Sequence, residues 1–198
     1  MKLLFISGPS GSGKTTLSNQ IILKIKNGFV LRTDNYYKTG LISRLLAKFV
    51  EGYFDKMISF NYKLFKKDFD FIVKNGISVQ DRNYNFKKKK IQNILNETKN
   101  ISYLIVEGIF AEEFSKTIYN LNYYFLEIKD KKNECMKRVV KRDFKERGKD
   151  KKQAKIDFLK SWDIYYEKFK TNKTKKHTNK FIINKKTDMD NLLKKLLY

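Results

Sequence analysis

The chain carries the stretch Gly8-Pro9-Ser10-Gly11-Ser12-Gly13-Lys14-Thr15, which matches G-x-x-x-x-G-K-[ST] at every fixed position. An apolar run at residues 3–6 precedes it, and a segment with apolar residues every four positions follows it. The motif therefore stands between an expected strand and an expected helix. Glycines let backbone N–H groups turn inward around phosphate oxygens, and the start of a helix adds its positive end. We predict a phosphate-binding loop for a nucleoside triphosphate rather than a glycine-rich turn that binds nothing.

Each part of this loop has an expected role. Lys14 should reach the β- and γ-phosphates, and the Thr15 hydroxyl should ligate Mg²⁺. The donor is expected to be ATP, with GTP as the other option. The residues predicted to bind it are Gly8, Ser10, Gly11, Ser12, Gly13, Lys14, Thr15 and Thr16.

The rest of the chain alternates short apolar runs with helical patterns. Further strands are expected at residues 29–31, 101–106, 123–128 and 181–183, with a possible short strand at 77–80. Helices are expected at residues 15–26, 41–50, 62–74, 131–147, 150–170 and 188–197. This order predicts an α/β fold of the P-loop NTPase type, with a parallel five-stranded sheet and helices on both faces. We expect one domain over residues 1–198, with a substrate-side excursion at about 51–99 and a helical lid at about 131–150.

Two carboxylates follow expected strands at the edge where ligands gather in such sheets. Asp34 comes just after the strand at 29–31 and is placed to take a proton from an attacking hydroxyl; the alternative is a capping aspartate. Glu107 ends the strand at 101–106 and is placed to hold Mg²⁺ directly or through water; the alternative is a capping glutamate before Gly108.

A basic segment at residues 137–148 is helical in pattern and contains three arginines. Arg138 and Arg142 are four residues apart and share a face, and Arg147 follows near the end. A cationic helix above the phosphate loop would neutralise charge on a phosphoryl group in transfer. The alternative is an exposed basic helix paired with its own Asp143 and Glu146.

The composition and net charge of the chain limit the classes of protein to which it can belong. The chain has 198 residues, is 41% hydrophobic and carries a formal net charge of +23. It has one Cys and one His, which excludes an internal disulfide and a Cys or His metal cluster. Of 44 basic residues only six are Arg, and Lys is spread from end to end, so we interpret the charge as compositional drift. We therefore expect a soluble cytoplasmic protein with no membrane or nucleic-acid partner, and allow a homo-oligomer.

Beyond the loop, several segments resemble the uridine kinases and their relatives, which include phosphoribulokinase. They occur in the order and approximate spacing of that family across about residues 2–195. The most specific are Asp34-Asn35-Tyr36-Tyr37-Lys38 and the block at residues 142–150. The others are Tyr53-Phe54-Asp55, Ser78-Val79-Gln80 with Tyr84-Asn85-Phe86, and Glu107-Gly108-Ile109.

The resemblance implies a role for each matched residue. Asp34 would be the catalytic base for a nucleoside 5′-hydroxyl. Tyr37, Asp55 and Tyr84 would line the nucleoside site, with Asp55 on the ribose hydroxyls. Arg142 and Arg147 would serve the lid and the phosphates, and Arg142 would also contact the substrate.

Four departures from the family pattern concern the acceptor. Arg82 stands where the family has Pro, Lys89 stands where a His contacts the base, and Asp157 stands near an expected Gln. The segment at residues 55–61 reads Asp-Lys-Met-Ile-Ser-Phe-Asn where the family has Asp-His-Pro-Asp-Ala-Phe-Asp. The expected activity is therefore ATP-dependent phosphorylation of a small hydroxyl acceptor, foremost uridine or cytidine. The alternatives are another nucleoside or a sugar as acceptor, and a P-loop protein that binds nucleic acid.

Overall fold

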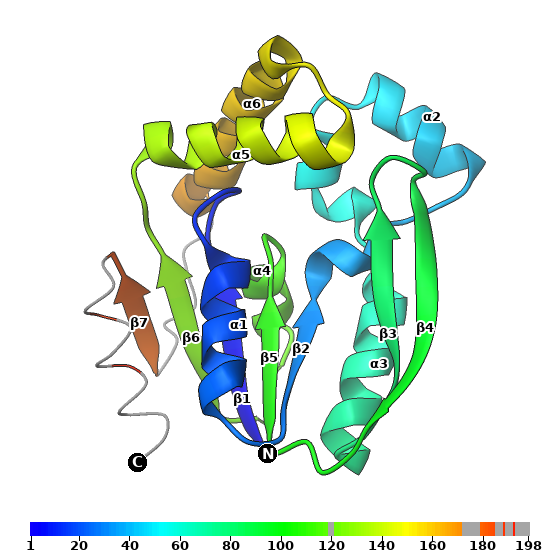
Figure 1. Ribbon diagram of the computed structural model, residues 1–198, viewed down its shortest axis with the longest axis vertical. Coiled ribbons are helices and arrows are strands. Elements are labelled where there is room, and N and C mark those ends of the chain that lie inside the picture. The colour runs from blue at the N-terminus through cyan, green and yellow to red at the C-terminus, as the bar shows by residue number, and fades with distance from the viewer. Residues whose placement is uncertain (119–120, 172–178, 185–187, 189–191, 193–198) are drawn as a thin grey trace.

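A parallel sheet forms the centre of the fold. The computed structural model describes residues 1–118, 121–171, 179–184, 188 and 192. Five parallel strands lie in the order β2-β5-β1-β6-β7 (Figure 1). Their bounds are β1 (Lys2–Ser7), β2 (Gly28–Arg32), β5 (Tyr103–Glu107), β6 (Tyr123–Ile128) and β7 (Lys180–Ile183). The predicted five-stranded parallel sheet is confirmed.

Helices cover both faces of this sheet. Alternate residues of a strand point to opposite faces, so each strand contributes side chains to both layers. On one face Leu4 and Ile6 pack against α1 (Lys14–Lys24). On the other face Leu3 and Phe5 pack against α3 (Tyr62–Asn75) and α4 (Ala111–Ser115). The continuous apolar run at the N-terminus thus belongs to a strand buried on both sides.

The second face is filled mainly by aromatic rings. Phe114 of α4 lies at its centre, with ring centroids 6.3 Å from Phe5, 4.6 Å from Phe65 and 5.0 Å from Phe69. All four side chains are at most 2% exposed. This cluster fixes β1 against α3, and so holds the start of the phosphate loop relative to the substrate side of the molecule.

A hairpin of β3 (Ser78–Asn85) and β4 (Lys90–Thr98) forms a separate antiparallel sheet. The predicted short strand at 77–80 captured only its start, and β4 was missed. The Arg82 Nε of β3 donates to the Asp68 Oδ2 of α3 over 2.6 Å, and this anchors the hairpin. Between β2 and α3 the chain forms η1 (Thr33–Tyr36), α2 (Leu41–Phe49), η2 (Tyr53–Asp55) and η3 (Met57–Ser59).

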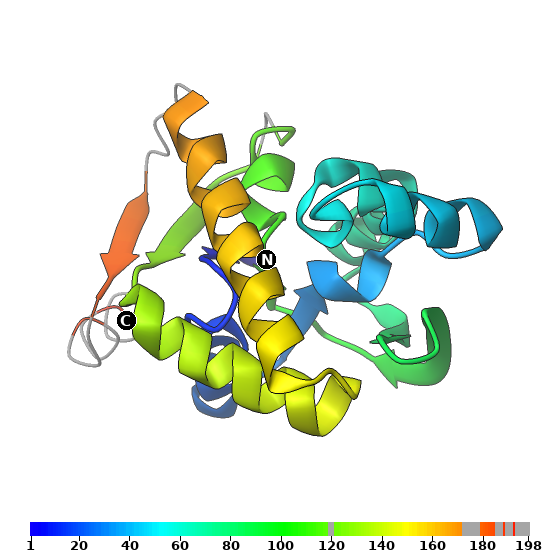
Figure 2. The same cartoon turned by 90° about the horizontal axis from the view of Figure 1, so that it is seen from above.

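Two long helices cross above the carboxyl ends of the strands (Figures 1 and 2). These are α5 (Lys132–Arg147) and α6 (Lys151–Thr171), which pack through Cys135, Val139 and Phe158. The predicted helix at 188–197 lies largely outside the described residues. Among the residues that are described, no helix combines the length and apolar character needed to span a bilayer.

We predict that Phe114→Ala destabilises the protein by about 3–5 kcal/mol, because it leaves a cavity among Phe5, Phe65 and Phe69. Phe71→Ala on α3 is the matched control, since that ring is 43% exposed, and it should cost no more than about 1 kcal/mol. Denaturant unfolding of both variants measures the difference. Equal losses would show that the aromatic cluster does not hold the sheet to α3.

Candidate active site

The candidate site forms where three strands end side by side. The register of the sheet sets Ile6 of β1 and Arg32 of β2 on either side of Glu107 in β5. The chain continues from β1 into the phosphate loop and from β2 into the turn that carries Asp34. Segments that are far apart in sequence therefore meet at one edge, as expected for the carboxyl ends of a parallel sheet.

The phosphate loop is held between α1 and α5. Gly11 has φ +79°, and a Cβ there would lie 2.5 Å from the Cys135 carbonyl oxygen, so only glycine fits. Arg138 of α5 donates from Nη1 to the Gly11 carbonyl oxygen over 3.0 Å. Thr16 is exposed on the first turn of α1, and Ser10 faces the pocket described below. Because α5 contacts the loop directly, a movement of that helix would displace the loop.

Lys14 is a cation buried to 9% exposure. Its Nζ donates to the carbonyl oxygens of Gly8 and Pro9, each over 3.0 Å. Burial lowers the pKa of this ammonium, while the nearby carboxylates of Glu107 and Asp34 act in the opposite direction. The arrangement places a positive charge at the loop. A phosphate group bound there would replace the two carbonyl oxygens as acceptor of the Lys14 N–H groups.

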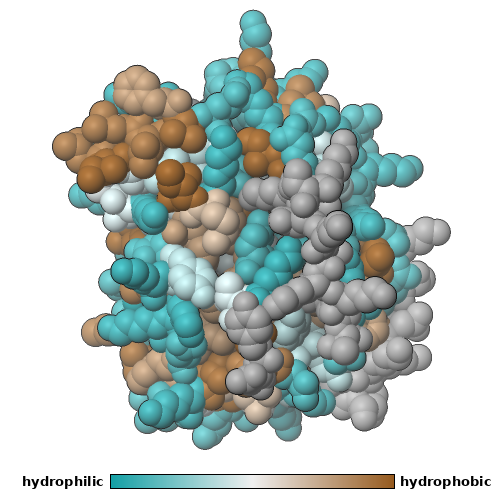
Figure 3. Space-filling model, turned by 180° about the vertical axis from the view of Figure 1, so that it is seen from behind, coloured by the Kyte–Doolittle hydropathy of each residue, from teal (hydrophilic) through white to brown (hydrophobic). Residues whose placement is uncertain are grey.

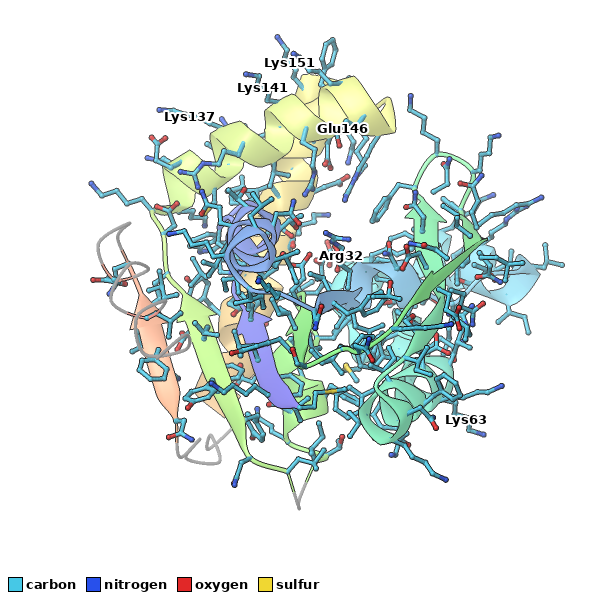
Figure 4. The ribbon with its side chains drawn as sticks, turned by 60° about the horizontal axis from the view of Figure 1, so that its bottom comes forward. Arg32, Lys63, Lys137, Lys141, Glu146 and Lys151 are labelled. Atoms are coloured by element: carbon cyan, nitrogen blue, oxygen red, sulfur yellow. The ribbon has the colours of Figure 1, made fainter. Side chains whose placement is uncertain are left out.

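A short series of contacts beside the loop joins Thr15, Glu107 and Arg32. The Thr15 hydroxyl donates to the Glu107 Oε1 over 3.0 Å, and the Arg32 Nε lies 3.3 Å from the same oxygen. Figure 4 shows Arg32 at the end of β2, where the strands open toward the lid helices. Burial raises the pKa of Glu107, and Lys14 opposes that effect. A hydroxyl and a carboxylate oxygen are the hard donors that Mg²⁺ prefers.

A metal ion here would take only part of its shell from the protein. Across the described residues, no three Asp, Glu, His or Cys side chains gather into a metal-binding group. Thr15 and Glu107 are therefore suited to Mg²⁺ that arrives with nucleotide phosphates, the usual manner in which this ion is held in kinases.

Two loops touch next to this pair. Gly108 has φ +143°, and a Cβ there would meet the Thr33 hydroxyl oxygen at 1.8 Å. This close approach brings the turn with Asp34 beside Glu107. The Asp34 Oδ1 and the Ser12 Oγ are both buried without a hydrogen-bond partner in the described part of the chain. Such polar atoms need a hydrogen-bond partner, which a bound ligand or an ordered water can supply.

A pocket of about 600 Å³ opens beside Asp34. Six of the predicted site residues line it, namely Ser10, Asp34, Tyr37, Asp55, Arg142 and Arg147. Its walls also come from η2, the hairpin, α5, α6 and the end of α2. The phosphate loop and Asp34 thus lie at one end of a cavity of the size that suits a small ligand.

Aromatic rings form one wall of this pocket. Tyr37 is 3% exposed, with ring centroids 5.2 Å from Phe54 and 5.9 Å from Phe86, both edge-on. Burial raises the pKa of Tyr37, and the negative charges of Asp34 and Asp55 add to the effect, so its phenol stays neutral. Tyr84 is not part of the lining: its ring packs 5.2 Å behind Tyr37. Of the two tyrosines expected to line the site, the structure therefore brings only Tyr37 to the cavity.

Asp55 faces the pocket from η2 and is tied to α6. The Ser161 hydroxyl donates to its Oδ1 over 2.6 Å. This contact fixes the carboxylate in the pocket, whose lining also includes Ser10 of the phosphate loop. Sequence reasoning missed Ser161 because its position on α6 carries no motif.

Two arginines of the predicted lid, Arg142 and Arg147, converge on one carboxylate. Asp143 is 3% exposed, and its Oδ1 accepts from Arg142 Nε and Nη2 over 2.9 and 2.8 Å. Arg147 lies 3.5 Å from the same oxygen and Lys149 lies 3.8 Å from Oδ2. Arg147 also covers the Phe86 ring at 3.6 Å. The arginines are thus paired near the pocket rather than exposed on a free helix face.

Other basic side chains of this region point elsewhere. Lys137, Lys141 and Lys151 extend from the outer face of the lid helices, away from the sheet (Figure 4). The cations of α5 therefore divide into an inner set at the site and an outer set in solvent.

Comparisons with known proteins agree with this geometry. Residues 3–190 match the model of the Phosphoribulokinase / Uridine kinase family. A uridine kinase of Borrelia duttonii (strain Ly) is 30% identical over 172 residues, which cover 85% of this chain and 80% of that protein. A uridine kinase of Staphylococcus aureus (strain JH9) is 31% identical over 156 residues, or 74% of this chain and 70% of that protein.

Among solved structures, a proposed fructose transport system kinase from Silicibacter sp. TM1040 superposes with a TM-score of 0.61 at 16% identity, covering 83% of this chain and 84% of that one. This likeness supports the P-loop kinase fold. The chain belongs to the phosphoribulokinase and uridine kinase family and is a small-molecule kinase, a phosphotransferase that moves a phosphoryl group from a nucleotide to a hydroxyl acceptor.

Proposed function

We propose that this kinase phosphorylates the 5′-hydroxyl of a pyrimidine nucleoside, uridine or cytidine, with ATP as the donor. The observation that carries the proposal is Asp34, whose buried Oδ1 has no partner among the described residues and whose side chain lines the pocket beside the phosphate loop. A carboxylate in that position accepts the proton of an attacking hydroxyl. GTP is the other donor to be tested.

On the donor side, Lys14 releases the Gly8 and Pro9 carbonyl oxygens and binds the β- and γ-phosphates. Backbone N–H groups of the loop surround the phosphates, and the Ser12 Oγ gains a partner. Thr15 and Glu107 hold Mg²⁺, which when bound neutralises charge on the phosphates. These roles agree with the oxygen ligands that Thr15 and Glu107 offer to a metal ion and with the burial of Ser12 and Lys14.

On the lid, Arg142 and Arg147 approach the phosphoryl group in transfer and stabilise its charge. Both are held beside the pocket by Asp143 until the phosphates arrive. Charge-assisted hydrogen bonds to phosphate oxygens then offset those lost to Asp143.

On the acceptor side, Asp55 accepts from the ribose hydroxyls and Tyr37 forms part of the aromatic wall. Lys89 also lines the pocket, at the tip of the hairpin. A lysine donates to a carbonyl oxygen but accepts nothing, so it favours no single base edge. Another nucleoside or a sugar is therefore the second candidate for the acceptor.

The test of the proposed function is nucleotide consumption over a panel of nucleosides and sugars, with Asp34→Asn measured alongside. The amide keeps the shape of the side chain but accepts no proton, so kcat should fall by about 10²–10⁴ while ATP affinity changes little. Binding is titrated calorimetrically on the same samples.

The control for the donor site is Lys14→Ala, which should lose turnover while its circular dichroism spectrum shows that it still folds. Lys14 was expected to be exposed toward the ligand, but it is buried and donates to the Gly8 and Pro9 carbonyl oxygens, so the unliganded melting temperature should change. If Asp34→Asn instead lowers ATP affinity and leaves kcat intact, Asp34 belongs to the metal or phosphate site. Full activity of purified Lys14→Ala would refute the assigned donor site.

We further predict that uridine is preferred over 2′-deoxyuridine. Loss of the 2′-hydroxyl removes a donor to Asp55, and a buried group without its partner costs about 1–3 kcal/mol. The ratio of kcat/KM should therefore be roughly tenfold to several hundredfold.

Asp55→Asn is the matched variant for this prediction, because it should reduce the discrimination along with the activity. Cytidine and a purine nucleoside complete the series. Equal kcat/KM for uridine and deoxyuridine in the wild type contradicts the role of Asp55, and no turnover with any nucleoside favours a different small acceptor.

A further inference from the structure

One face of α2 carries apolar side chains that are open to solvent. Leu41, Leu45 and Phe49 recur every four residues and so share one stripe of the helix, and Ile42 lies beside that stripe. Leu41 is 73% exposed, Ile42 74%, Leu45 47% and Phe49 82%. Figure 3 shows a hydrophobic patch over this part of the molecule from behind. A contiguous apolar surface of this kind marks a contact with another molecule or with a membrane.

The orientation of α2 is the reverse of that of an ordinary surface helix, whose apolar stripe faces the core. The residue of α2 that is buried against the protein is Ser43, at 7% exposure. Its hydroxyl donates to the Lys38 carbonyl oxygen over 2.7 Å and lies 3.1 Å from the Tyr53 hydroxyl of η2. The apolar side of α2 thus faces outward because hydrogen bonds hold the opposite side against the protein.

Cations accompany this apolar face. Residues 38–50 contain Lys38, Arg44 and Lys48 and no carboxylate, and all three basic residues are exposed. Glu51, which follows, is already paired over 2.6 Å with a lysine of α6. The whole chain carries a net charge of +23. The surface around α2 therefore attracts an anionic partner more strongly than a neutral one.

We propose that α2 docks onto an anionic lipid surface. Its apolar stripe reaches the boundary between headgroups and acyl chains, and its cations meet the lipid phosphates. An apolar helix face with Lys or Arg beside it is the combination that binds a membrane in this manner. The contact departs from the expectation, drawn from the sequence, of no membrane partner, since it needs only one short helix and no spanning segment. It does not depend on which acceptor the kinase uses.

A protein partner for the same face is the main alternative. A stable protein contact usually buries about 800 Å² on each partner, and α2 is only about 13 Å long. The helix also projects from the side of the molecule (Figure 2), so it offers a ridge rather than a groove. A fluid bilayer receives such a ridge without a complementary shape of its own. The form and the charge of α2 therefore favour lipid.

Cosedimentation with phosphatidylcholine vesicles, with and without phosphatidylglycerol, tests the proposal. The wild type should bind the anionic vesicles, less in high salt, because salt screens its cations. Ile42→Asp should weaken this binding about tenfold or more, since it places a carboxylate in the apolar stripe.

Leu23→Asp on α1 is the matched control, because Leu23 is 86% exposed and the substitution changes the net charge by the same amount. It should bind the anionic vesicles nearly as the wild type does. Neither Leu23 nor Ile42 lines the pocket beside Asp34, so both variants should keep their activity toward soluble substrates.

A second measurement covers the case in which Ile42→Asp does not fold. An environment-sensitive fluorophore on Ile42→Cys should report an apolar environment when anionic vesicles are added, and the same label on Leu23→Cys should not; the native Cys135 is buried.

The proposal is overturned if the wild type does not bind anionic vesicles. It is also overturned if Ile42→Asp and Leu23→Asp weaken binding equally, because net charge alone would then explain the contact. Sedimentation velocity without lipid supplies the last outcome. If the wild type self-associates, Ile42→Asp abolishes that association and vesicle binding is unchanged, the face belongs to a protein contact and not to lipid.

Discussion

The burial of one ammonium group, that of Lys14, is the constraint on which the rest of the site depends. A cation that is 9% exposed is stable only if oxygen atoms surround it, and the Gly8 and Pro9 carbonyls supply two. Those carbonyls can turn inward only because the loop is short and glycine-rich. Glu107 and Asp34 then supply the negative charge, and the strand order brings both to the end of β1.

Much of this arrangement could be predicted from the sequence, and the reason is that its signals are local. The loop motif, the buried strands and the carboxylates that follow them all lie within short windows. Strand β4 could not be predicted, because its apolar residues Ile91, Ile94 and Leu95 have the spacing of a helix face and most of its residues are exposed. Its pairing with β3 is given only by the register of the two strands and by the hydrogen bond that the Arg82 Nη1 donates to the Asn93 Oδ1.

The pocket beside Asp34 was harder to predict than the phosphate loop for a related reason. Its wall joins η2, the hairpin, α5 and α6, so no single segment carries a readable motif. Tyr84 illustrates the difficulty: its ring contacts Tyr37 and Phe86, which line the pocket, but Tyr84 itself is not in the lining. Ser161 was missed because it acts only by holding Asp55. Asp143 was expected as a partner of the basic helix in the alternative interpretation, and it does pair with Arg142 and Arg147, but beside the pocket.

The lid shows why net charge is a poor guide to what this protein binds. Lys137 and Lys141 raise the total charge but point into solvent, where water and salt screen them (Figure 4). Arg142 and Arg147 contribute one positive charge each, as a lysine does. They lie at the pocket because the buried carboxylate of Asp143 pairs with both of them there. A guanidinium has five N–H donors, and Arg142 uses only Nε and Nη2 toward the Asp143 Oδ1, so its pairing with the carboxylate leaves donors for a second anion. The carboxylate of Asp143 thus fixes where two of the many cations lie, and position at the pocket rather than total charge decides which cations can meet a ligand there.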